Sequence, residues 1–212
     1  MMDIRRTGVR SSMPLDKLAG TNDWYYAVDW ACDLYEAEEL VARGEAFEGS
    51  TLHLLHYPDG RVWTPFEKRR HVYIETPVWD GEAIAVLTVD LDRREMAVFR
   101  LDAQGSPHEI VRLPLSLVPD CYNLKLGVSP LTVYRQGGEG DFSIVWPEHA
   151  AFTIDDTESF FHRDGDELYF SKWFEDPDYR EEVWIRALQT GAKLRTIPGC
   201  MYRMPDGAWW LL

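Results

Sequence analysis

Three acidic residues, Asp120, Asp155 and Glu158, lie in segments that separate short apolar runs of this 212-residue chain. Two carboxyl groups about 5 to 9 Å apart can hydrolyse a glycosidic bond, one as the acid and the other as nucleophile or base. Acidic loops also occur wherever charge keeps a protein soluble, and their carboxylates then cap turns or face solvent. We favour the second interpretation, because 36 acidic residues stand against 22 basic ones.

The concentrated basic segment of the chain is Arg69-Arg70-His71. Two guanidinium groups beside an imidazole could form a rim that binds a carboxylate or a phosphate. The segment could instead balance the acidic residues at 36–39, since isolated basic runs are usually solvated faces. We favour charge balance over ligand binding. The candidate ligand-binding residues are Arg69, Arg70, His71, Asp120, Asp155 and Glu158.

Patterns of metal ligands are missing from the sequence. His53 and His56 are three apart in a predicted strand, so their side chains point to opposite faces. The three cysteines are an odd number at no zinc-ligand spacing, which favours a reducing compartment. A nucleophilic Cys121 or Cys200 would need a base such as His71, whereas small buried thiols explain both residues more simply. We therefore expect neither a metal nor another cofactor.

The candidate residues lie between strands that repeat at an interval of about forty residues. Residues 72–115 contain four runs rich in β-branched and aromatic residues, which we name strands a to d. Asp80-Gly81 separates strands a and b, and such pairs suit two-residue hairpins because both central positions need positive φ. Residues 121–154 and 158–199 repeat the order. The other expected turns are Gln104-Gly105, Ser129-Pro130, Pro147-Glu148, Asp164-Gly165 and Thr190-Gly191.

The two ends of the chain supply a further unit. Residues 51–66 indicate a hairpin that turns at Asp59-Gly60, and residues 200–212 indicate another at Asp206-Gly207. Joining the first and last strands in one sheet would cover strand edges that are otherwise unpaired. Residues 24–30 are also β-like, so two segments are candidates for strand b of this shared unit.

One segment departs from the β pattern. Asp33 and Glu36 form a capping-box pattern, apolar residues follow them, and Gly44 can end a helix. A short helix is therefore predicted over residues 33–43, in the b-to-c connection of the shared unit.

In the spacing of their turns and the regular recurrence of their strands, residues 51–212 resemble β-propellers. The pairing of Gly-His with Trp-Asp that marks WD40 repeats and the repeated double-glycine motif of kelch repeats are absent, so no functionally named family is matched. The resemblance implies an all-β, small closed propeller of four blades, or five if the N-terminal segment adds one. The domain would span residues 23–212 after a flexible tail at 1–22. Ligands would bind at the channel mouth, beside the d-to-a and b-to-c connections.

The formal charge of −14 disfavours nucleic acid and anionic membranes as partners. The sequence contains no apolar run of the length of a membrane span and no secretory signal at its start. We expect a cytoplasmic protein whose partner is another protein or a small molecule. A non-catalytic binding module that uses the channel-mouth face is the favoured function, and a hydrolase, for example of glycans, is the alternative.

Overall fold

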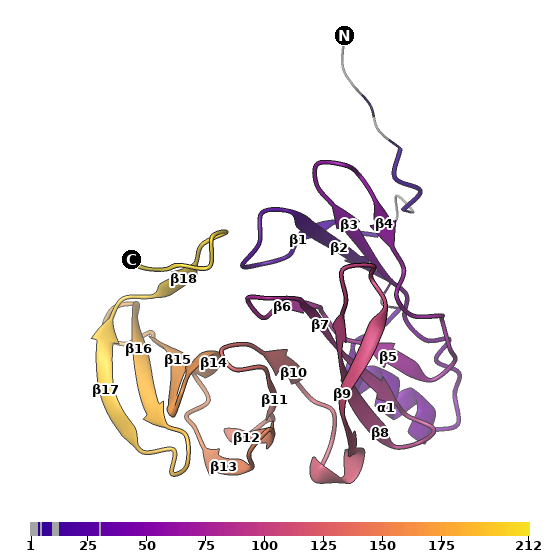
Figure 1. Ribbon diagram of the computed structural model, residues 1–212. Helices are drawn as coiled ribbons and strands as arrows, with labels where there is room; N and C mark the ends of the chain where they lie inside the picture. The colour runs from indigo at the N-terminus through magenta and orange to yellow at the C-terminus, as the bar shows by residue number, and fades with distance from the viewer. Residues whose placement is uncertain (1–3, 5, 10–12, 30) are drawn as a thin grey trace. The chain divides into compact units, whose positions relative to one another are not determined.

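The computed structural model describes residues 4, 6–9, 13–29 and 31–212. These residues form an all-β chain with one α-helix and four successive antiparallel meanders, the four-blade propeller arrangement predicted from the turn spacing (Figure 1). No sheet among them closes on itself. The chain divides into two compact units, Met1–Ser116 and Leu117–Leu212, with two of the four meanders in each.

The first unit contains two sheets. The first sheet has the order β1 (Asp16–Lys17), β2 (Trp24–Val28), β3 (Leu52–His56) and β4 (Val62–Trp63). The second has the order β5 (Val72–Ile74), β7 (Ile84–Asp90), β8 (Glu95–Leu101) and β9 (Pro107–Pro114), and β6 (Val78–Trp79) also pairs with β7. β2 pairs with β3 along its whole length, so residues 24–28 occupy the strand b position beside the Asp59-Gly60 hairpin. β1 lies within the segment 1–22 that was expected to be a tail.

Helix α1 (Leu34–Ala42) connects β2 to β3 and confirms the predicted helix. The Asp33 carboxylate caps its N-terminus by accepting a hydrogen bond of 2.7 Å from the backbone N–H of Glu36. Leu34 and Ala37 bury one face of the helix. Gly44 follows the last turn with a φ of 75°, a left-handed conformation that glycine adopts without steric cost.

The second unit follows a short 3₁₀ turn, η1 (Leu115–Leu117). Its first sheet has the order β10 (Leu124–Gly127), β11 (Thr132–Gln136), β12 (Asp141–Trp146) and β13 (Ala150–Thr153). The next has the order β14 (Glu158–Asp164), β15 (Glu167–Phe174), β16 (Arg180–Ala187) and β17 (Lys193–Pro198). β18 (Met201–Arg203) and β19 (Trp209–Leu211) pair with each other in the C-terminal hairpin predicted at Asp206-Gly207. The shared closing sheet stays a prediction.

Each of the six turns predicted from the repeat lies between two paired strands. A second regularity links consecutive sheets within a unit. A Cβ added to Gly105, in the turn between β8 and β9, would lie 2.5 Å from a ring carbon of Trp63 in β4. A Cβ added to Gly191, in the turn between β16 and β17, would lie 2.3 Å from a ring carbon of Phe152 in β13. The c-to-d glycine of one sheet therefore packs on a strand d aromatic ring of the preceding sheet.

Each unit buries an apolar core to which both of its four-stranded meanders contribute. The core of the first unit contains Leu18, Val28, Leu52, Leu54, Ile74, Ile84, Val86 and Leu101. The core of the second unit contains Phe142, Ile144, Ala150, Ile154, Phe160, Leu168, Phe170 and Leu188. In the second unit, Phe142 and Phe170 meet edge to face with ring centroids 5.1 Å apart, an arrangement that aromatic pairs prefer. Within each unit, the loops at both ends of the sheets therefore extend from strands that a packed apolar core holds in place.

Candidate functional site

Asp120 lies in the connection before β10 and belongs to a polar cluster in the second unit. Its carboxylate accepts two hydrogen bonds of 2.7 Å from Nη2 of Arg135 and one of 2.9 Å from Nε. The Arg135 side chain is only 4% exposed, whereas the Asp120 side chain is 35% exposed. Asp120 therefore presents a carboxylate to solvent while its other side is tied to a buried guanidinium.

Arg135 is held from a second side by Asp141, which accepts a short hydrogen bond from Nη1. Burial lowers the pKa of Arg135, but its hydrogen bonds to Asp120 and Asp141 outweigh this effect and the net shift is upward. Gly137 lies directly on the guanidinium, because an added Cβ would be 2.5 Å from both terminal nitrogens. The glycine-rich loop between β11 and β12 thus shields a permanent positive charge between two carboxylates.

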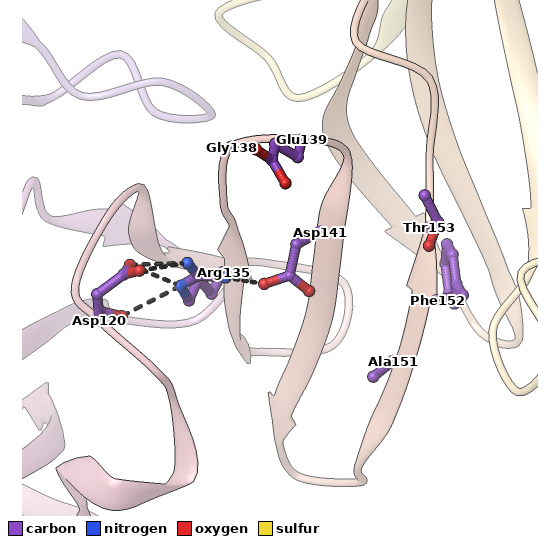
Figure 2. A pocket seen from close by; sticks show the side chains of 8 residues that line it. All are labelled: Asp120, Arg135, Gly138, Glu139, Asp141, Ala151, Phe152 and Thr153. Atoms are coloured by element: carbon purple, nitrogen blue, oxygen red, sulfur yellow. Dashed lines mark hydrogen bonds and ion pairs between the residues drawn. The ribbon is translucent and has the colours of Figure 1, made fainter.

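A cavity of about 650 Å³ opens beside this cluster (Figure 2). In Figure 2, Arg135 lies between the carboxylates of Asp120 and Asp141, and β13 borders the cavity on its other side. Its lining residues are Asp120, Arg135, Gly138, Glu139, Asp141, Ala151, Phe152 and Thr153. The cavity lies at the sheet end formed by the b-to-c and d-to-a connections, the end at which the resemblance to propellers implies that ligands bind. Three carboxylates and one guanidinium give it a net negative charge.

The other two predicted carboxylates are paired elsewhere in the second unit. Asp155 forms a short ion pair with Lys172, whose side chain is only 5% exposed. The hydrogen bond from Lys172, with others from Thr157, lowers the pKa of Asp155 to about 2. Glu158 is completely buried and receives hydrogen bonds of 2.8 and 2.6 Å from Arg186. Neither residue lines the cavity beside Arg135.

The basic segment lies in the first unit, in the connection from β4 to β5. Nη2 of Arg69 donates to Asp90 at 2.7 Å, and Nδ1 of His71 lies 2.8 Å from Asp92. Both acidic partners belong to the end of β7 and the turn after it, not to helix α1, so the pairing differs from the expected balance with residues 36–39. Arg70 is exposed. Arg69 lines a smaller hollow of about 210 Å³ between Phe66 and Phe99.

The structure reveals residues that the sequence did not single out. Arg135, Lys172 and Arg186 are cations near or inside apolar strands, and each neutralises one of the predicted carboxylates. A fourth buried cation, Arg163, forms the same kind of pair with Glu148. The available signal was a basic residue beside apolar residues within a predicted strand, because such a residue is buried only when it is paired.

No cysteine lines the cavity beside Arg135. None of the three cysteines forms a disulfide, and Cys121 is completely buried, as predicted for a small core residue. Cys200 is partly exposed, which differs from that expectation. Over the described ranges, no group of three or more histidine, cysteine or acidic residues is arranged to hold a metal ion. The described helix is too short to cross a membrane.

The comparisons with known proteins give distant structural neighbours only. No family model matches the chain, and no curated protein sequence matches it. A solved structure from Bacteroides uniformis, described as a candidate 6-phosphogluconolactonase, aligns over 87% of this chain and 59% of its own, with 14% identity and a TM-score of 0.41. A puromycin hydrolase aligns over 91% of this chain and 32% of its own, with 15% identity and a TM-score of 0.43. The chain spans less than two thirds of the length of either neighbour, and at this similarity neither carries an argument about activity.

Proposed function

We propose that this chain is a non-catalytic binding module, and that the cavity beside Arg135 is its main ligand site. The observation that carries the proposal is the fixed arrangement of Asp120, Arg135 and Asp141 at the rim of an open cavity of about 650 Å³. A binding site needs a few polar groups that are already oriented, so that little conformational entropy is lost when the ligand arrives. The buried guanidinium provides that orientation for both carboxylates.

The protonation states favour binding over hydrolysis. A general acid works best when its pKa lies near the working pH, and enzymes achieve this by raising the pKa of a carboxyl group through burial or a like charge. Asp155 has the opposite environment, since Lys172 holds its pKa near 2. Glu158 is sealed from solvent by its pair with Arg186. These carboxylates suit ion pairs better than proton transfer.

The charge of the cavity indicates the class of ligand. Asp120, Glu139 and Asp141 outnumber the single guanidinium, and Ala151 and Thr153 lie beside them in the lining. A ligand with a positively charged group on an alkyl stem fits this lining, because the positive group gains from the carboxylates while the stem carries no polar group that needs a partner. A lysine or arginine side chain of a partner protein has this character. The net charge of −14 would also steer a basic partner toward the chain.

The test compares two charge reversals in the same unit. Glu139 is exposed in the loop over the cavity, and Glu175 is exposed in the loop between β15 and β16. Binding of short lysine-rich and arginine-rich peptides would be measured by calorimetry. Glutamate-rich peptides of equal length would serve as controls of the opposite charge. Glu139→Lys should weaken binding of the basic peptides at least tenfold, and Glu175→Lys should change it little. Equal binding by both variants would reject the cavity as the site.

A further inference from the structure

A second cavity, of about 360 Å³, lies in the first unit at the opposite sheet end from the basic segment. Three indole rings, those of Trp24, Trp63 and Trp79, line it together with the side chains of Glu82 and Asp102. The rings come from β2, β4 and β6, and the acidic residues come from the turns after β6 and β8. Residues from both sheets of the unit therefore form one aromatic, acidic cavity that the function proposed above does not use.

The indole rings are fixed before any ligand binds. All three pack against the apolar core of the unit. Trp24 and Trp63 contact each other with ring centroids 4.4 Å apart. Gly105 presses on the ring of Trp63 with a φ of 84°, and no side chain fits in that space. The cavity is therefore preformed, and little of the binding free energy would be spent on ordering the side chains that line it.

The two acidic side chains give the cavity a negative charge. Asp102 accepts hydrogen bonds of 2.9 Å from the backbone N–H groups of Gln104 and Ser106 and lies 2.9 Å from His108. These contacts lower its pKa, first through His108, so the carboxylate is ionised at neutral pH. Glu82 is exposed at the rim. A ligand in this cavity therefore meets aromatic walls and one or two negative charges.

We propose that this cavity binds a methylated ammonium group, carried by a small quaternary amine or by a methylated lysine side chain. Indole rings attract cations through their negative faces, and tryptophan does so best among the aromatic residues. Methyl groups suit such walls, because they spread the charge and remove the N–H donors that would otherwise need water or acceptors. The carboxylates of Glu82 and Asp102 supply the negative charge that attracts the ammonium group. A bare metal ion does not fit, since the cavity offers it two carboxylates and three rings.

The test uses choline and a peptide containing trimethyllysine, each titrated into the full chain and followed by tryptophan fluorescence and calorimetry. The neutral choline isostere 3,3-dimethylbutan-1-ol and the same peptide with unmodified lysine serve as controls. Either cation should bind roughly tenfold or more tightly than its control, since each aromatic contact contributes roughly two- to fivefold. The tighter of the two cations identifies the source of the ammonium group. Equal binding of cation and isostere, binding of neutral sugars instead, or no binding would overturn the proposal.

Two variants assign any binding to this cavity. Glu82→Gln should weaken choline binding several-fold, while Glu48→Gln, at an exposed site of the same unit outside the cavity lining, should not. Trp79→Leu should weaken it further, and Glu82→Gln remains informative if the tryptophan variant does not fold. Glu139→Lys in the second unit should leave choline binding unchanged, so this proposal and the proposed function can fail separately. A choline affinity that Glu82→Gln leaves at the wild-type value would refute the assignment.

Discussion

The buried pair of Glu158 and Arg186 offers a sharp test of whether the predicted carboxylates are structural. The Glu158 side chain is completely inaccessible, that of Arg186 is 13% exposed, and two charge-assisted hydrogen bonds of 2.8 and 2.6 Å join them. Glu158→Gln keeps the shape of the side chain but removes its charge. One amide oxygen can still accept from Arg186, while the amide N–H₂ group faces another guanidinium donor. The variant thus leaves a buried positive charge without its counter-ion.

The magnitude follows from what such a change costs. Removing one partner of a buried ion pair destabilises a protein by about 3 to 5 kcal/mol, and the remaining hydrogen bond places this variant near 3 kcal/mol. For a chain of this size, about 3 kcal/mol corresponds to a fall in Tm of roughly 6 to 12 °C. Glu175→Gln, at an exposed site of the same unit, should stay within about 0.5 kcal/mol of the wild type.

The assay is thermal and urea unfolding of the wild type, both variants, Arg186→Met and the Glu158→Gln/Arg186→Met double variant. If the two residues act as a pair, the double variant should be less destabilised than the sum of the single variants. A Glu158→Gln protein as stable as the Glu175→Gln control would refute the reasoning. An increase in stability would favour the hydrolase alternative, because catalytic groups are often held at a cost to stability.

Three further changes test other parts of the structure. Gly105→Ala should unfold more readily than Gly60→Ala by about 1 to 3 kcal/mol in urea, because both need positive φ but only Gly105 touches a ring. Burial lowers the pKa of His162, so the folded protein resists protonation of this side chain, and its stability should fall as the pH drops below about 6.5. His162→Phe should therefore flatten that part of a plot of Tm against pH. Arg70→Glu should leave Tm within a degree or two, and a change in partner capture by this variant would support the basic segment as a second contact surface.

Local signals in the sequence were sufficient to predict the order of the strands along the chain. Asp80-Gly81 and Asp164-Gly165 turn the chain where the repeat predicts, but only the glycine of each pair has a positive φ, so neither pair is the expected two-residue turn with both residues left-handed. The capping pattern from Asp33 to Glu36 places α1 correctly. Such features depend on residues within about one turn of each other, and the sequence shows them directly.

The partners of the candidate site residues could not be predicted in this way. Asp120 lies beside a cavity, and its pairing with Arg135 depends on the register of β10 on β11. Lys172 reaches Asp155 only because β15 folds back on β14. The tryptophan cavity draws on strands of two sheets. Contacts of this kind arise from long-range strand pairing, which residue type and spacing alone do not determine.

The most direct test of the proposed function is a titration of the isotopically labelled chain with a lysine-rich peptide, followed by amide chemical shifts. We expect the shifts to concentrate at the residues around the cavity beside Arg135, in residues 137–141 and 151–153 and at Asp120. They should be lost in Glu139→Lys and kept in Glu175→Lys. Shifts that are absent, that spread over the acidic surface without a centre, or that persist in Glu139→Lys would contradict the account.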